Sequence, residues 1–200
     1  MTAPQLALPS AERRSDPSVT VHGVLALAIA FFVLLGTLAG AFLAARAGTT
    51  VWPPKGFTAQ EYFDNTLLIT ALIGAVAGWW GLYGVLRGER RQAITGLALS
   101  IFMQGAFLNL LTYMVRQSHL SPRQDAYGVL WYALVIAVAA AFATGIGVAG
   151  VALARVAGGQ VTAAEPTLAW CAAWYGTFVA LSWVVMYYLC LLYTSDAADE

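Results

Sequence analysis

Five long apolar segments make up most of this chain, and none of them contains a lysine, arginine, aspartate or glutamate. They cover approximately residues 21–45, 66–86, 93–115, 127–154 and 168–189. Each is at or above the roughly 20 residues that a helix needs to cross the hydrocarbon core of a bilayer. A backbone in lipid must satisfy its own hydrogen bonds, and long segments without alternation do so as helices rather than as barrel strands. The sequence therefore predicts an all-α integral membrane bundle with five transmembrane helices.

The composition agrees with a single membrane domain. Of the 200 residues, 60% are hydrophobic and 10% are charged, whereas about 25% of the residues of a soluble domain are charged. Ten basic residues balance ten acidic ones, so we expect no nucleic acid partner. The nineteen glycines are expected to allow close helix contact, because lipid tails give helices no hydrophobic drive to associate.

The two ends of the chain differ from the apolar segments. Residues 1–20 form a polar stretch with Arg13 and Arg14, which we expect to remain as a cytoplasmic N-terminal segment because the apolar run after it is too long for a signal peptide. Residues 190–200 read CLLYTSDAADE and resemble the translation of a sequencing adapter. We therefore expect this stretch to be an artefact and exclude it from the fold. Cys171 is then the remaining cysteine, and no disulfide is predicted.

The basic residues predict the orientation in the membrane. Six of them fall on the side of the N-terminus, namely Arg13, Arg14, Arg87, Arg90, Arg91 and Arg155, and four fall on the other side, namely Arg46, Lys55, Arg116 and Arg123. Cytoplasmic loops carry an excess of lysine and arginine. We therefore expect a multi-pass protein of the plasma membrane with a cytoplasmic N-terminus.

Residues able to carry chemistry are missing from the apolar segments. Proton pumps and haem proteins place ionisable or ligating groups at membrane depth, whereas His22 and His119 lie at the edges of segments here. The stretch Gly145–Gly150 has the spacing of a dinucleotide fingerprint, but it lies inside an apolar run rather than after a strand. The sequence predicts no catalytic residue, no metal ligand and no cofactor bound by this chain.

Small and polar residues within the segments suggest where helices meet. The pairs Gly36 with Gly40 and Gly74 with Gly78 predict close packing of the first and second helices. Gln104 and Asn109 are the most costly polar residues at depth, and such amides usually join helices. At 100° per residue they lie about 140° apart around a helix, which weakens the case for one pore lined by both side chains. A polar substrate path through these two residues, Thr112 and Tyr113 remains an alternative.

The segment ends carry further signals. Asp64, before the second apolar segment, has the residue type of an N-cap. Trp52, which precedes two prolines, suits the membrane interface. We expect Trp52, the four glycines and the two amides to contact another helix, lipid or another subunit.

The first apolar run and the loop after it resemble a known family. Residues 31–46 read FFVLLGTLAGAFLAAR and are followed by Trp52-Pro-Pro54, which is similar to subunit III of haem-copper oxidases in its short five-helix form. Further similarities follow in the same order along the chain: residues 86–90, Gln104-Gly105, residues 126–128, and Trp183 with Tyr187 and Tyr188. The Trp-Pro-Pro loop with the preceding Arg46 is the most specific of them.

The resemblance also has gaps. The acidic and histidine residues of the family would fall near Phe31, Phe107, Val138, Ala141, Thr177 and Ala180, which are all apolar or neutral here. The resemblance implies a non-catalytic subunit that packs against core oxidase subunits I and II, which carry haem and copper, and that holds phospholipid between its helices. Two alternatives stay open: a small membrane transporter or channel component, and an oxidase assembly factor.

Overall fold

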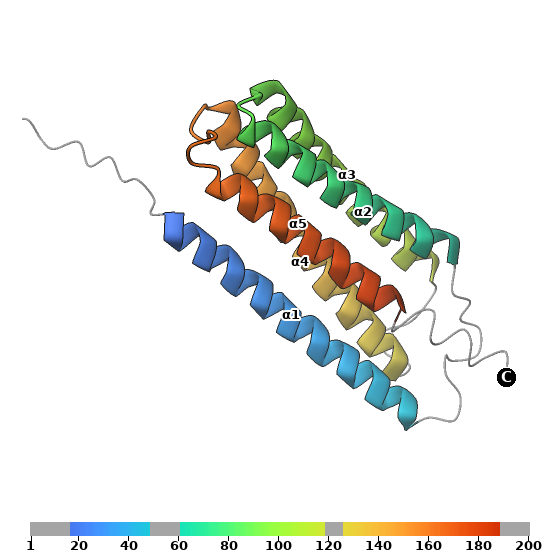
Figure 1. Ribbon diagram of the computed structural model, residues 1–200. Coiled ribbons are helices and arrows are strands. Elements are labelled where there is room, and N and C mark those ends of the chain that lie inside the picture. Colours follow the sequence, from blue (N-terminus) through green and yellow to red (C-terminus); the bar gives the residue numbers. More distant parts are fainter. Residues whose placement is uncertain (1–16, 49–60, 119–125, 189–200) are drawn as a thin grey trace, which may run out of the picture.

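The computed structural model describes residues 17–48, 61–118 and 126–188, and these residues form five long helices (Figure 1). The helices are α1 (Pro17–Ala47), α2 (Glu61–Leu86), α3 (Arg90–Gln117), α4 (Ala126–Ala157) and α5 (Thr167–Met186). All five are long and apolar enough to cross a membrane. The predicted all-α bundle with five transmembrane helices is therefore confirmed. Trp52, residues 1–16 and the expected adapter stretch 190–200 lie outside the described residues.

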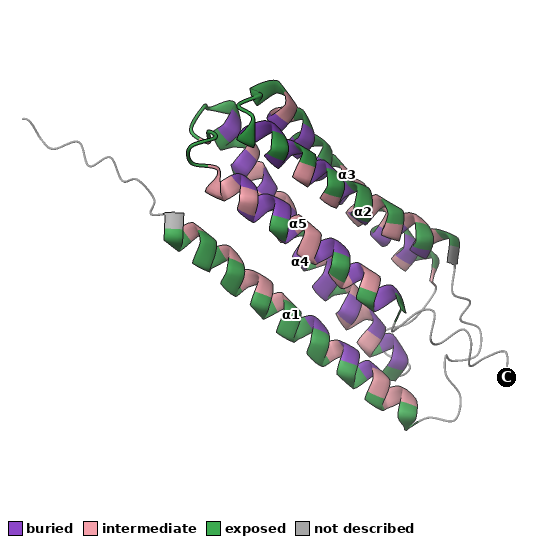
Figure 2. Cartoon of the chain, in the orientation of Figure 1, coloured by how far each residue is buried: buried purple, intermediate pink, exposed green. Residues whose placement is uncertain are grey.

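The helices pack as a layered bundle in which α4 and α5 lie between α1 and the α2/α3 pair (Figure 1). The most extensive contact joins α2 to α3, and further contacts join α3 to α4, α2 to α5 and α4 to α5. Helix α1 packs against α4 and α5. It is also the most exposed helix, with buried residues only in its C-terminal half (Figure 2).

The predicted pairing of the first and second helices is wrong. Helix α1 has its principal contacts with α4 and α5 rather than with α2, and a Cβ added at Gly36 or Gly40 would meet nothing within 4 Å. Gly74 and Gly78 face α3 instead. A Cβ added at Gly74 would lie 3.2 Å from Met103 Cβ, and one added at Gly78 would lie 3.4 Å from Ser100 Oγ. A small-residue spacing identifies a face that another helix can approach, but it carries no information about which helix that is.

Three further glycines bring α2 and α3 into backbone contact. A Cβ on Gly81 would lie 2.9 Å from the Leu97 amide nitrogen, and one on Gly84 would lie 2.6 Å from the Ala93 nitrogen. A Cβ on Gly96 would overlap the backbone of Gly81. Because the two backbones touch, no side chain fits between the helices at this crossing.

The start of α2 differs from the prediction. The helix begins at Glu61, so Asp64 lies within its first turn rather than at an N-cap position, and it is only 3% exposed.

The C-terminal end of α2 leads into a tight turn. Gly88 has φ +72°, and the Glu89 amide donates to the Gly84 carbonyl oxygen at 2.9 Å. This is a Schellman-type end. It allows the short turn that brings α3 back along α2.

Candidate functional site

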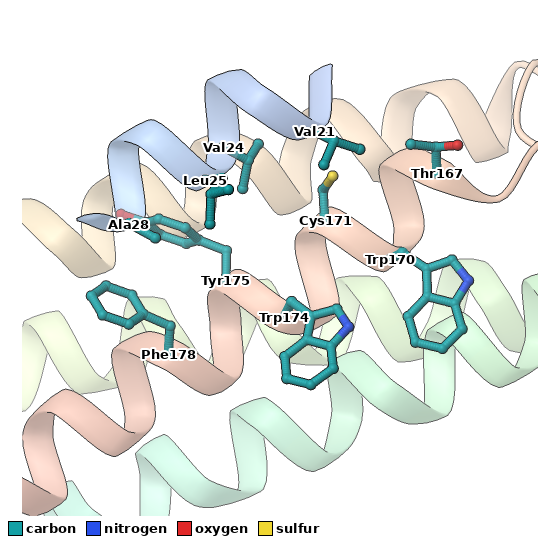
Figure 3. A pocket seen from close by; sticks show the side chains of 10 residues that line it. All are labelled: Val21, Val24, Leu25, Ala28, Thr167, Trp170, Cys171, Trp174, Tyr175 and Phe178. Atoms are coloured by element: carbon teal, nitrogen blue, oxygen red, sulfur yellow. The ribbon is translucent and has the colours of Figure 1, made fainter. Parts of the chain in front are cut away.

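An apolar groove separates the N-terminal halves of α1 and α5 (Figure 3). Its volume is about 540 Å³, within the range of about 300–1,000 Å³ that is typical of ligand pockets. Helix α1 contributes Val21, Val24, Leu25 and Ala28, and α5 contributes Thr167, Trp170, Cys171, Trp174, Tyr175 and Phe178. The groove exists because α1 is anchored by its other half, where Leu35, Ala39 and Phe42 are buried.

The α5 wall of the groove is aromatic and is supported from behind. Trp79 of α2 makes edge contacts with Trp170 and Trp174, with ring centroids 5.6 and 5.3 Å apart. The indole Nε1 of Trp79 donates a hydrogen bond of 2.7 Å to Thr177 Oγ1. Such edge-to-face pairs have a preferred geometry. The Trp79 contacts therefore fix both tryptophans in place from the α2 side.

Polar groups at the groove are few. The hydroxyl of Tyr175 donates to the Ala141 carbonyl oxygen of α4 at 3.4 Å, so the ring, rather than the oxygen, faces the groove. Cys171 is buried beside it. Within the described residues no three His, Cys, Asp or Glu side chains gather at one place. The groove can hold an apolar chain, but it presents no acid–base pair to a reactant.

Aromatic and aliphatic side chains occupy five of the six positions where the resemblance would place ionisable residues, and Thr177 occupies the sixth. Phe107 is fully buried and stacks on Phe142 of α4, with centroids 3.7 Å apart and planes at 5°, and Trp183 of α5 meets its edge at 5.2 Å. Val138, Ala141 and Ala180 are also buried. At these positions α3, α4 and α5 therefore meet through apolar packing rather than through ionisable groups.

The two amides predicted as contact residues, Gln104 and Asn109, lie on different faces of α3, as their spacing predicts. Gln104 is buried at the α3–α4 crossing, where its Oε1 atom lies against Gly145, and its Nε2 atom lies 3.4 Å from Ser100 Oγ. Asn109 is exposed on the outer face of α3. The structure does not bring the two together. The suggested contacts of the glycines and amides with lipid or another subunit remain predictions.

Sequence reasoning missed the groove and the backbone contact between α2 and α3. Trp170, Trp174, Tyr175 and Phe178 recur at helical spacing, but a tryptophan near the end of an apolar run is equally typical of a membrane interface. A usable signal for the backbone contact existed, because Gly74, Gly78, Gly81 and Gly84 follow each other at steps of three or four and thus share one helix face.

The fold defines the class: an integral, multi-pass membrane protein built as an all-α bundle. No family model matches the chain. Curated proteins named cytochrome c oxidase subunit 3 do match it. Those of Carassius auratus and Cyprinus carpio are 29% identical over 138 residues, and that of Oncorhynchus mykiss is 32% identical over 143 residues. Each alignment covers 68% of this chain and 53% of the relative.

The chain therefore spans about half the length of the curated relatives it matches. The predicted resemblance to subunit III of haem-copper oxidases is confirmed by these relatives. The protein is a divergent relative of the cytochrome c oxidase subunit 3 family.

Proposed function

We propose that this protein is a non-catalytic, subunit III-like component of a haem-copper respiratory oxidase. The observation that carries the proposal is its relationship to cytochrome c oxidase subunit 3 over 68% of the chain. In this role it packs against core subunits I and II of the oxidase. Haem and copper are held by those partners, and this chain contributes membrane helices and a lipid site to aerobic electron transport.

The charge distribution supports a plasma-membrane orientation with a cytoplasmic N-terminus. Among the described residues, Arg87, Arg90, Arg91 and Arg155 lie at the end of the bundle where α1 and α5 begin, whereas Arg46 and Arg116 lie at the opposite end. Arginine next to a short cytoplasmic turn can also contact lipid phosphate. The excess of positive charge is thus on the same side as the N-terminus.

The groove between α1 and α5 is the proposed phospholipid site. Its walls are apolar and it is open rather than enclosed, so an acyl chain can enter it from the surrounding lipid. Thr167, at the first position of α5, lies at the end of the groove where a headgroup would meet water. The aromatic wall provides a rigid surface for an ordered lipid.

No feature of the described residues supports the two alternatives, a transporter or channel component and an oxidase assembly factor. A transporter or channel needs polar groups along one path, and Gln104 is buried at α3–α4 while Asn109 faces outward. An assembly factor would bind the oxidase only during its maturation. Purification from growing cells separates these cases, because a subunit stays with the mature oxidase in a fixed ratio.

The decisive experiment is purification of the tagged full chain in mild detergent from its native membrane. We expect haem absorbance and the two core subunits to co-elute with it in a constant ratio. A haem-free single species would overturn the proposal. Elution with only apo-core subunits would favour the assembly factor.

A matched pair of variants tests the lipid site. Ala28→Trp fills the groove, whereas Ile136→Trp adds the same volume on the outer face of α4, where Ile136 is 65% exposed. We expect mass spectrometry of the purified protein to show loss of one tightly bound phospholipid in Ala28→Trp alone. Equal lipid content in both variants would remove the groove from the proposal.

A further inference from the structure

A second hollow lies at the end of the bundle where α2 leads into α3 and α4 leads into α5. Its volume is about 200 Å³, whereas one water molecule needs about 10–15 Å³ of such space. Its walls come from both turns, and Arg90 and Thr162 provide its polar side chains. It shares no lining residue with the groove between α1 and α5, which has no charged side chain on its wall. We call this hollow the inter-turn pocket.

Arg90 reaches across the inter-turn pocket from the start of α3 to the end of α4. Its Nη2 atom donates a hydrogen bond to the carbonyl oxygen of Ala157, the last residue of α4. Such a bond caps the C-terminus of a helix, but a guanidinium has five N–H donors and stays charged. Arg90 therefore joins the two turns and still brings positive charge and further donors to the pocket.

Positive charge exceeds negative charge at this end of the bundle. Residues 84–93 and 154–167 contain four arginines and two exposed glutamates. In the described part of the chain, neither Arg90 nor Arg91 pairs with a carboxylate, and Arg87 lies over the Tyr83 ring, 4.4 Å from its centroid. Clustered charges of one sign attract counter-ions, most strongly at a hollow in the surface. The inter-turn pocket therefore favours an anionic ligand.

The depth of the pocket in the membrane narrows the kind of anion. Helices α3 and α4 have 28 and 32 residues and are thus about 42 and 48 Å long at about 1.5 Å per residue. The hydrocarbon core is only about 30 Å thick, so the helix ends extend into the headgroup region. Phosphate is the common anion there, and arginine matches its oxygens with parallel N–H donors.

We propose that the inter-turn pocket binds one phosphate group, which contacts the Arg90 guanidinium and the Thr162 hydroxyl. Two sources offer this chemistry, namely the headgroup of a phospholipid and inorganic phosphate in the water. The inference goes beyond the proposed function and does not depend on it, because the site is built from this chain alone. It is also distinct from the groove, whose apolar walls suit an acyl chain.

Binding is tested on the purified, delipidated full chain in detergent without phosphate. Calorimetry with inorganic phosphate tests the free anion. Native mass spectrometry with phosphatidylglycerol tests the headgroup, and diacylglycerol serves as the lipid that lacks phosphate. We expect Arg90→Gln to weaken binding of one of the two phosphate probes about ten- to hundredfold, the effect of losing a charged hydrogen-bond partner. Arg116→Gln, an equal charge change at an exposed position of the opposite end, should have no effect.

The two probes separate the sources of the phosphate. A response of inorganic phosphate to Arg90→Gln identifies a water-borne anion, and a response of phosphatidylglycerol alone identifies a lipid headgroup. If neither probe responds, or if diacylglycerol responds equally, the proposal is overturned. Lower thermal stability of Arg90→Gln with unchanged binding would mean that Arg90 only caps α4.

A second pair of variants tests the pocket without changing Arg90. Ala163 lines the pocket, whereas the neighbouring Ala164 does not, and both are exposed in the α4–α5 loop. We expect Ala163→Trp to fill the pocket and weaken binding of the phosphate probe at least tenfold, and Ala164→Trp to leave it unchanged. Equal binding by both variants would contradict a site in this pocket.

Discussion

The α2–α3 and α1–α5 interfaces are both largely apolar but differ in how closely their helices approach. At α2–α3, Gly81, Gly84 and Gly96 let the backbones touch. At α1–α5, large aromatic side chains on one helix face small aliphatic ones on the other, and a groove of about 540 Å³ remains between them. In lipid, where burial of apolar surface gives no driving force, contact area decides which helices associate firmly. The first interface is therefore structural, and the second is able to hold a ligand.

The largest effect is expected at the backbone crossing of α2 and α3. Gly96→Leu should destabilise the purified chain by about 3 kcal/mol or more, because overpacking at a closed contact forces the helices apart. The same substitution at Gly40 of α1, where a Cβ meets nothing within 4 Å, should leave stability within about 0.5 kcal/mol. Reversible unfolding in mixed micelles measures both. Equal losses would mean that α1 is packed as tightly as α2.

A smaller loss of stability is expected from truncation in the C-terminal half of α1 than at the α2–α3 crossing, and almost none from truncation in its N-terminal half. Phe42 is buried in its C-terminal half and lies 5.6 Å from the Tyr127 ring of α4, whereas Leu25 lines the groove. We expect Phe42→Ala to cost about 2 kcal/mol, less than the roughly 3–5 kcal/mol typical of soluble cores because in lipid only the packing contribution is lost. Leu25→Ala should cost less than about 0.5 kcal/mol. The same unfolding assay, performed on delipidated protein, decides this. A large cost at Leu25 would show that the groove is closed without lipid.

The smallest loss of stability is expected at Trp79, which packs behind the aromatic wall of the groove. Trp79→Phe keeps a ring against Trp170 and Trp174 but removes the hydrogen bond to Thr177. We expect a loss of about 0.6–1.5 kcal/mol, in the range of interhelical hydrogen bonds in lipid. Trp80→Phe, at the neighbouring exposed position, is the control and should be neutral. A neutral Trp79→Phe would mean that the ring contacts alone hold the aromatic wall.

The number and approximate extent of the helices were predictable, and so was the separation of Gln104 from Asn109. The pairing of helices was not. Gly36 and Gly40 have the same spacing as Gly74 and Gly78, yet the first pair faces open space and the second faces α3. The groove was equally hidden, because Trp170 and Trp174 are as typical of a membrane interface as of a binding wall.

The sequence by itself determined that five helices form and that their long apolar runs contain no charged residue. Each helix satisfies its own backbone hydrogen bonds, so its existence depends only on local length and apolarity. Tertiary structure alone decided which faces meet, where the backbones touch and where a groove remains. In a membrane the outward and inward faces of a helix are both apolar, so hydrophobic periodicity does not distinguish them. Which faces pack together therefore depends on shape complementarity between segments that are distant in the sequence.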